Sequence, residues 1–267
     1  MVEVEDVTNS SNEPSSSQNS SSNTNSTNQP NSSRLMIFIS NDKISFVLYL
    51  TRLFSIACIF AFLVPLFGYD QNTLYQKAIL ASAAISALKL HQRLQNERFQ
   101  LSREYFSKII VEDSFHYLLY SLIFLNTSPI TVVLVPIASF SIMHVSTYSQ
   151  KLLGVLGMSS IGFVRKAIDL VIAKQRDIML FVAINEILLA PTIIVMIFMG
   201  KCGLMVPFIY YRFICMRYQS RRNPYSREIF AQLRLAINMY TNNANCPQFV
   251  KNLANNMINL VNRLAPQ

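Results

Sequence analysis

The chain has 267 residues, of which 51% are hydrophobic and 14% are charged, and its mean hydropathy is +0.30. Soluble domains usually carry about 25% charged residues, so this composition excludes an ordinary soluble domain and predicts a membrane protein built from apolar helices. The net charge of +9 would also suit nucleic acid, but the basic residues are interleaved with apolar runs, which excludes nucleic acid from the expected partners.

Charge is distributed unevenly along the chain. Before Gln76 there are three basic and six acidic residues, a net charge of −3, and the remainder carries 20 basic and 8 acidic residues, a net charge of +12. Basic connections beside membrane segments are typical of the cytosolic side. They also favour anionic lipid headgroups as partners.

The N-terminal tail, residues 1–40, is rich in Ser and Asn and poor in apolar residues. We expect it to be disordered, because it buries too little surface to offset its chain entropy, and it lacks the pattern of a signal peptide. Its four glycosylation sequons matter only if this end is lumenal; they begin at Asn9, Asn19, Asn25 and Asn31.

Six apolar runs predict three helical hairpins in a membrane domain over residues 41–216. The pairs are 44–67 with 74–90, 115–125 with 130–145, and 178–199 with 204–216. The two middle runs would be roughly 16 and 24 Å long as helices, against a hydrocarbon core of about 30 Å. The middle hairpin could therefore cross the bilayer with help from flanking residues, or lie as a wedge in one leaflet.

The connections between these runs indicate a common orientation. The short ones, 68–73, 126–129 and 200–203, carry almost no charge, whereas the long ones and the tail from 217 to 267 are basic. All three hairpins should therefore enter from the cytosolic side. Arg52, near one end of the first run, is expected to snorkel to the interface.

Three further segments have amphipathic patterns. One lies within 150–177, with Phe163 on its apolar stripe, and two lie in the basic tail, with Ile229 and Leu233 on the first stripe and Phe249 on the second. These spacings predict helices that either lie on the membrane surface, bind a partner or pack on the protein itself. The expected fold class is thus an all-α polytopic membrane protein of helical hairpins with amphipathic C-terminal helices.

Glu186 is the one acid deep in an apolar run. Intramembrane carboxylates are functional candidates because their burial is costly. Asn185 and Pro191 predict a helix break here, and Arg212 on the returning helix is a possible counter-ion. A structural Glu–Arg clamp is the favoured interpretation, and transport or proton movement is the alternative.

A second candidate site lies at the start of the central hairpin. Glu112, Asp113 and His116 lie within about one helical turn, and Glu112 and His116, four residues apart, share a helix face. No sequence motif of a hydrolase or metalloenzyme includes these residues, so we expect an interfacial cap on the hairpin, with no catalytic residue, metal or cofactor. A lipid-handling enzyme or transporter centred on Glu112, His116 and Glu186 is the alternative.

A basic cluster follows the last apolar run. Ordinary membrane anchoring explains it, and so does a site that binds lipid phosphates or a partner, with guanidinium groups holding the anion and tyrosines at the interface. Its residues are Arg217, Tyr218, Arg221, Arg222, Tyr225 and Arg227.

Several stretches together resemble the transmembrane protein 33 family, also called Krüppel homologue 2. They are ALKLHQRL at 87–94, FQLSR at 99–103, EDSFHYLLYSLIFLN at 112–126, NEI at 185–187, PFIYYRF at 207–213, RYQSRRNPYSR at 217–227 and RLAP at 263–266. The similarity covers about residues 36–266 and leaves out the N-terminal tail.

The resemblance implies an integral protein of the endoplasmic reticulum and nuclear envelope. It implies roles in tubular network shape, often through reticulon-type hairpin proteins, in nuclear pore organisation and in stress signalling. A non-enzymatic organiser of membrane architecture is therefore the expected function, and a scaffold that regulates stress sensors is a further alternative.

Overall fold

The computed structural model describes residues 31–64, 68–95, 102–156, 162–220, 223–242 and 247–264. Within these ranges every regular element is an α-helix, which confirms the all-α class. The helices are α1 (Asn31–Asn41), α2 (Lys43–Leu63), α3 (Gln71–Leu94), α4 (Arg103–Val111), α5 (Asp113–Leu125), α6 (Thr131–Leu156), α7 (Gly162–Ala173), α8 (Gln175–Phe198), α9 (Val206–Gln219), α10 (Tyr225–Thr241) and α11 (Gln248–Leu264).

Three of the described helices are long and apolar enough to cross a membrane. They are α2, α6 over Thr131–Val155, and α8. This finding confirms a polytopic membrane protein.

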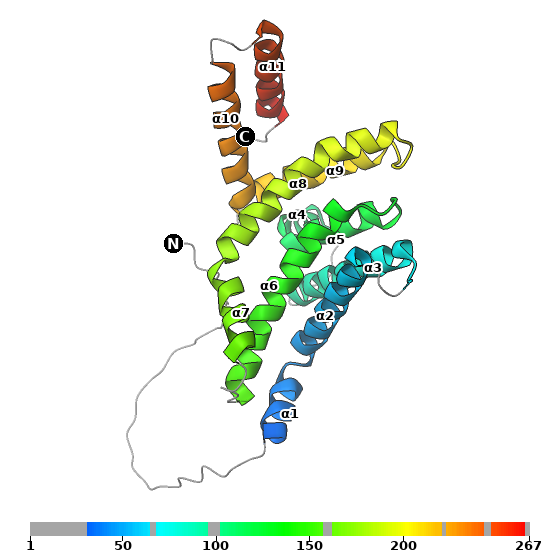
Figure 1. Ribbon diagram of the computed structural model, residues 1–267, viewed down its shortest axis with the longest axis vertical. Coiled ribbons are helices and arrows are strands. Elements are labelled where there is room, and N and C mark those ends of the chain that lie inside the picture. Colours follow the sequence, from blue (N-terminus) through cyan, green and yellow to red (C-terminus); the bar gives the residue numbers. More distant parts are fainter. Residues whose placement is uncertain are drawn as a thin grey trace, which may run out of the picture.

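Six helices form two layers of three. The helices that could cross a membrane lie in the order α2, α6, α8 in one layer, and their hairpin partners lie in the order α3, α5, α9 in the other, with α3 against α2 and α9 against α8. Each expected hairpin therefore places one helix in each layer (Figure 1).

The three hairpin turns lie at one end of these layers (Figure 1). The Tyr75 hydroxyl, just after the first turn, lies 3.4 Å from both the Phe124 carbonyl and the Thr127 hydroxyl at the second turn. At the third turn Gly200 has a φ of 68°, and the N–H of Lys201 bonds the Met196 carbonyl at 3.0 Å. This is the glycine-centred arrangement that commonly ends a helix.

The core lies in the half of the molecule nearest the turns and is rich in aromatic rings. Tyr120 lies 4.9 Å from Phe124 and 5.2 Å from Phe213 between ring centroids, so α5 and α9 meet through these side chains. Tyr210 and Tyr75 complete the buried aromatic group. Rings at these spacings add stability beyond the area that they bury.

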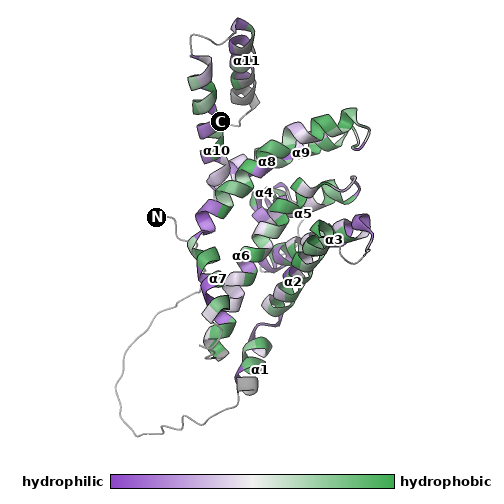
Figure 2. Ribbon diagram, in the orientation of Figure 1, coloured by the Kyte–Doolittle hydropathy of each residue, from purple (hydrophilic) through white to green (hydrophobic). Residues whose placement is uncertain are grey.

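Large apolar side chains remain exposed near the third turn. Figure 2 shows this end of α8 and α9 as mostly hydrophobic. The most exposed of them are Phe198, Met199, Leu204, Met205 and Phe208. Such a surface is suited to lipid rather than water.

The boundaries of several elements differ from expectation. The break expected in α8 at Asn185 and Pro191 is wrong, because the helix runs without interruption from Gln175 to Phe198. The connection between the expected runs 74–90 and 115–125 contains α4, and α6 continues to Leu156, beyond the expected end at 145. Helix α1 begins at Asn31, inside the segment expected to be disordered, and residues 1–30 lie outside the described ranges.

Candidate functional site

A buried ion pair joins α8 to α9. The Nε of Arg217 donates to Oε2 of Glu186 at 3.1 Å, and the two residues are 2% and 1% exposed. The Tyr117 hydroxyl on α5 donates to the other carboxylate oxygen, so both oxygens of Glu186 are bonded. The Arg217 guanidinium also lies 4.9 Å from the centroid of the Tyr117 ring, within range of a cation–π interaction.

The counter-ion thus differs from the one expected. Arg212 is exposed on α9, and Arg217, not Arg212, forms the ion pair with Glu186. Glu186 lies 14 residues before Gly200 and Arg217 lies 14 residues after Gly203, so these two residues are equally far from the turn. Antiparallel helices bring such positions to the same level, so counting outward from the turn would have identified Arg217.

Arg217 also contacts the start of the central hairpin. Its Nη1 lies 3.4 Å from Oδ1 of Asp113, and the Ser220 hydroxyl donates to the same oxygen at 2.8 Å. Burial alone would raise the pKa of the Asp113 carboxyl, but the nearby imidazole of His116, the charge of Arg217 and the Ser220 hydroxyl bring that pKa below its ordinary value.

A second link joins α8 to α6. The side-chain amide of Asn185 donates to the Val132 carbonyl at 3.0 Å. Pro136 has no N–H, so in α6 this carbonyl lacks its usual partner four residues on. Asn185 replaces that missing bond. On the same stretch of α8 the Tyr210 hydroxyl donates to the Glu186 carbonyl at 2.6 Å.

The side chains of Glu112 and His116 have different partners. Glu112 forms an ion pair with Arg93 at the end of α3, and Nε2 of His116 donates to the Ile110 carbonyl at 2.6 Å. Nδ1 of His116 lies 3.6 Å from Asp113. These contacts fasten α4 and α3 to the first turn of α5.

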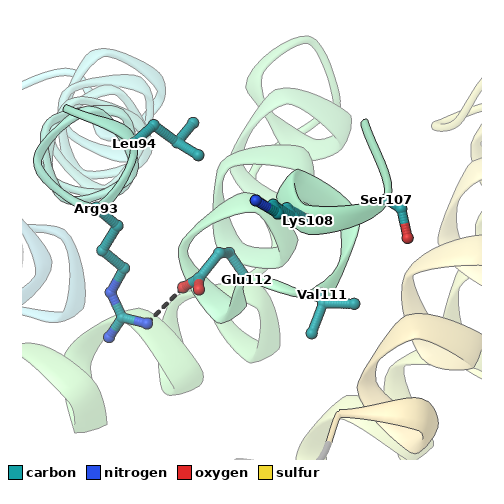
Figure 3. A pocket seen from close by; sticks show the side chains of 6 residues that line it. All are labelled: Arg93, Leu94, Ser107, Lys108, Val111 and Glu112. Carbon is teal, nitrogen blue, oxygen red and sulfur yellow. Dashed lines mark hydrogen bonds and ion pairs between the residues drawn. The ribbon is translucent and has the colours of Figure 1, made fainter. Parts of the chain in front are cut away.

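An open pocket of about 290 Å³ lies beside the Arg93–Glu112 pair (Figure 3). Figure 3 shows the Arg93 side chain extending to Glu112, with Lys108 nearby and the apolar residues Leu94 and Val111 on opposite sides of the pocket. The lining mixes two cations with one carboxylate. Ser107 is the remaining polar residue of the lining.

The basic cluster expected to bind headgroups is divided. Arg217 is buried in the ion pair described above, and Arg227 is exposed on α10. Tyr218 is half-buried, with its ring 5.6 Å from that of Phe230, and Tyr225 is half-buried at the start of α10. Arg221 and Arg222 lie outside the described residues.

The amphipathic helices leave much of their apolar surface uncovered. On α7, Phe163 is 85% exposed while Ile168 is buried. On α10 only Ile229 of the expected stripe is buried, whereas Leu233 is exposed. Phe249 on α11 is 76% exposed. Helices α10 and α11 extend together beyond the hairpins (Figure 1), so packing on the protein's own body accounts for only the first turns of α10.

Three hairpins with lipid-suited surfaces and a buried ion pair that locks two of them together define a helical multi-pass membrane protein. The chain belongs to the family described as "Transmembrane protein 33/Nucleoporin POM33", whose family model matches residues 27–267. This finding confirms the family that the sequence resembles.

Curated relatives cover most of the chain. Transmembrane protein 33 of Homo sapiens is 44% identical over 230 residues, which is 86% of this chain and 92% of the relative. Krueppel homolog 2 of Drosophila melanogaster is 41% identical over 88% of this chain and 83% of its own length. The Transmembrane protein 33 homolog of Caenorhabditis elegans is 33% identical over 86% of this chain and 84% of its own. No solved structure matches this chain.

Proposed function

We propose that this protein organises the membranes of the endoplasmic reticulum and nuclear envelope without catalysing a reaction. In this proposal its hairpins bias membrane curvature, and its surfaces contact other membrane proteins, including those of the reticulon type. Tubular network shape and the distribution of nuclear pores would be the affected properties.

The proposal rests on one observation: each of the six hairpin helices carries a charged or polar residue at some distance from its turn, and together these residues form a polar layer. We use this name for Arg52, Lys89, Asp113, His144, Glu186 and Arg217, which lie on α2, α3, α5, α6, α8 and α9 respectively. At about 1.5 Å per residue, Lys89 lies roughly 27 Å from the turn end of α3, and the other five lie roughly 17–20 Å from the turn ends of their helices. A hydrocarbon core is about 30 Å thick.

A polar layer at the cytosolic headgroup level would therefore leave the turns short of the opposite headgroups. Such hairpins occupy more volume in the cytosolic leaflet than in the other one. The exposed apolar side chains around the third turn, such as Leu204 and Phe208, suit a tip that lies among acyl chains. Asymmetric occupation of this kind bends a membrane towards the cytosol.

The amphipathic helices support the same mechanism. Helices α7, α10 and α11 all lie on the side away from the turns, where the proposal places the cytosol (Figure 1). Their uncovered apolar side chains could enter the headgroup region, which would add area to the same leaflet. Arg227 and the basic residues around it would contact anionic headgroups.

The family description adds support for the nuclear envelope, because it names a nucleoporin. The alternative of a lipid-handling enzyme or transporter is less well supported. Glu186 would have to exchange protons or contact substrate, and its two carboxylate oxygens already bond Tyr117 and Arg217 in a buried position. We therefore assign Glu186 a structural role.

Reconstitution of the purified protein into liposomes tests the proposal. We expect tubules or smaller vesicles as the protein-to-lipid ratio rises, measured by electron cryomicroscopy. A variant with Leu233→Gln, Tyr240→Gln and Phe249→Gln separates the tail from the hairpins and should keep part of the effect. Vesicles of unchanged size at every ratio would contradict the proposal.

A further inference from the structure

Three basic side chains meet between α2, α3 and α6. Lys89 Nζ lies 3.2 Å from Nε2 of His144, and Arg52 is close enough for its charge to act on both. Arg52 is 7% exposed, and its Nη2 has no hydrogen-bond partner. The snorkelling expected of Arg52 is therefore wrong. We call Arg52, Lys89 and His144 the cation cluster.

When Lys89 is charged, the hydrogen bond between Lys89 and His144 can have only one direction. An ammonium group donates and cannot accept, so Nε2 of His144 accepts and the imidazole is neutral. The cluster then holds the two positive charges of Arg52 and Lys89. A buried charge without a partner is costly, and its cost falls when an anion binds.

The two carboxylates at the start of the neighbouring helix α5 are bonded elsewhere. Glu112 pairs with Arg93, and Asp113, whose charge also acts on Lys89, bonds Arg217 and Ser220. Among the residues that the structure describes, no ion pair joins Arg52 or Lys89 to an acid.

Arg52 and Lys89 come from α2 and α3, the two helices of the first hairpin, and the charge of Arg52 acts on Lys89. Ser55, one helical turn from Arg52 on the same face of α2, is fully buried, and its hydroxyl has no partner. The guanidinium nitrogen of Arg52 and this hydroxyl are thus two buried donors without an acceptor on one face of α2.

We propose that the cation cluster binds the phosphate of an anionic phospholipid between α2, α3 and α6. A guanidinium group bonds phosphate oxygens in pairs, and an ammonium group adds a point charge. The acyl chains would lie along the apolar flank of α2 beside Arg52, which includes exposed Leu53 and half-buried Ile56. This proposal requires insertion in a membrane but not the shaping activity proposed above.

Thermal unfolding of the full-length protein in a neutral detergent tests it. Phosphatidylserine and phosphatidylinositol should each raise Tm in a saturable way, while phosphatidylcholine should not. Arg52→Gln and Lys89→Gln should each weaken the apparent affinity at least tenfold. Lys77→Gln, which removes an exposed charge from the same helix α3, is the matched control and should keep the wild-type affinity.

Arg52→Gln has a second signature. Because it removes a buried charge without a partner, it should raise Tm in the absence of lipid while it lowers the response to lipid. Equal responses of wild type and both variants would overturn the proposal, as would an equal response to phosphatidylcholine. The same measurement is made with inorganic phosphate. A rise in Tm with phosphate alone, at the same apparent affinity, would overturn the assignment to a lipid.

Discussion

Glu186 and Arg217 are equally distant from the turn that joins α8 to α9, and they form an ion pair that is almost completely buried. The pair fixes the register of the third hairpin, because sliding either helix by one turn would separate the charges by about 5 Å. Through Tyr117 and Asp113 it also fixes where the second hairpin meets the third.

Removing one partner of this ion pair should be strongly destabilising. Glu186→Gln or Arg217→Gln leaves a buried charge without its counter-ion, which costs about 3–5 kcal/mol in free energy of unfolding. The double variant should lose less than the sum of the two, since the charges are coupled. Circular dichroism in detergent measures the loss of helix on heating.

Arg212→Gln is the matched control for these variants. Arg212 lies on the same helix but is exposed, so its replacement should change the free energy of unfolding by no more than about 0.5 kcal/mol. An Arg212 variant as unstable as the Arg217 variant would show that α9 is rotated relative to the structure.

Asn185→Leu should destabilise the contact between α8 and α6. It leaves the Val132 carbonyl without its donor, at a cost of about 1–3 kcal/mol. Pro136→Ala restores an N–H to α6, so the double variant should recover much of the loss. Thermal melts of the four proteins measure this rescue, and equal destabilisation with and without Pro136 would show that the amide does not replace the helical bond.

Asp113 should make stability depend on pH in the acidic range. Its pKa is lowered in the folded protein, so its contribution is present at neutral pH and is lost as the pH falls through that lowered value. Wild type should therefore exceed Asp113→Asn in Tm at pH 7, and the gap should close well below about pH 4. A gap that is constant with pH would mean that the carboxylate charge contributes nothing.

The exposed stripes of α10 and α11 should control binding of the tail to membranes. Replacing Leu233, Tyr240 and Phe249 by Gln should reduce the amount of reconstituted tail that is protected from protease, because the apolar faces then lose their affinity for the interface. Replacing exposed Arg234 and Arg227 by Gln should reduce protection only on anionic vesicles. Equal protection in all variants would assign these stripes to a protein partner.

The hairpins could be predicted from sequence because each helix contributes a long apolar run and each turn contains polar or glycine residues. The course of α8 could not, because a proline removes a single hydrogen bond and a membrane helix can continue past it with help from neighbours. Pro191 indicated a break, whereas Tyr210 and Asn185 show how neighbouring helices bond this region.

The site was predicted only in part. Glu186 was recognised because a carboxylate in an apolar run needs a partner, but the choice of Arg212 considered proximity in the hairpin without its register. Arg52 was assigned to the interface because a single arginine near a helix end usually snorkels. Arg52 is buried because α3 and α6 pack against α2. The residue pattern of α2 alone does not predict where those two helices lie.

The central claim is that three hairpins enter the membrane from one face. Single cysteines in a background without Cys58, Cys202, Cys215 and Cys246 test it, using a membrane-impermeant maleimide on sealed microsomes. Ser107→Cys, Arg165→Cys and Arg227→Cys should all be labelled from the cytosolic side, whereas Tyr69→Cys, Ser128→Cys and Lys201→Cys at the turns should not. Labelling of any one of the first three only after the microsomes are opened would contradict the claim.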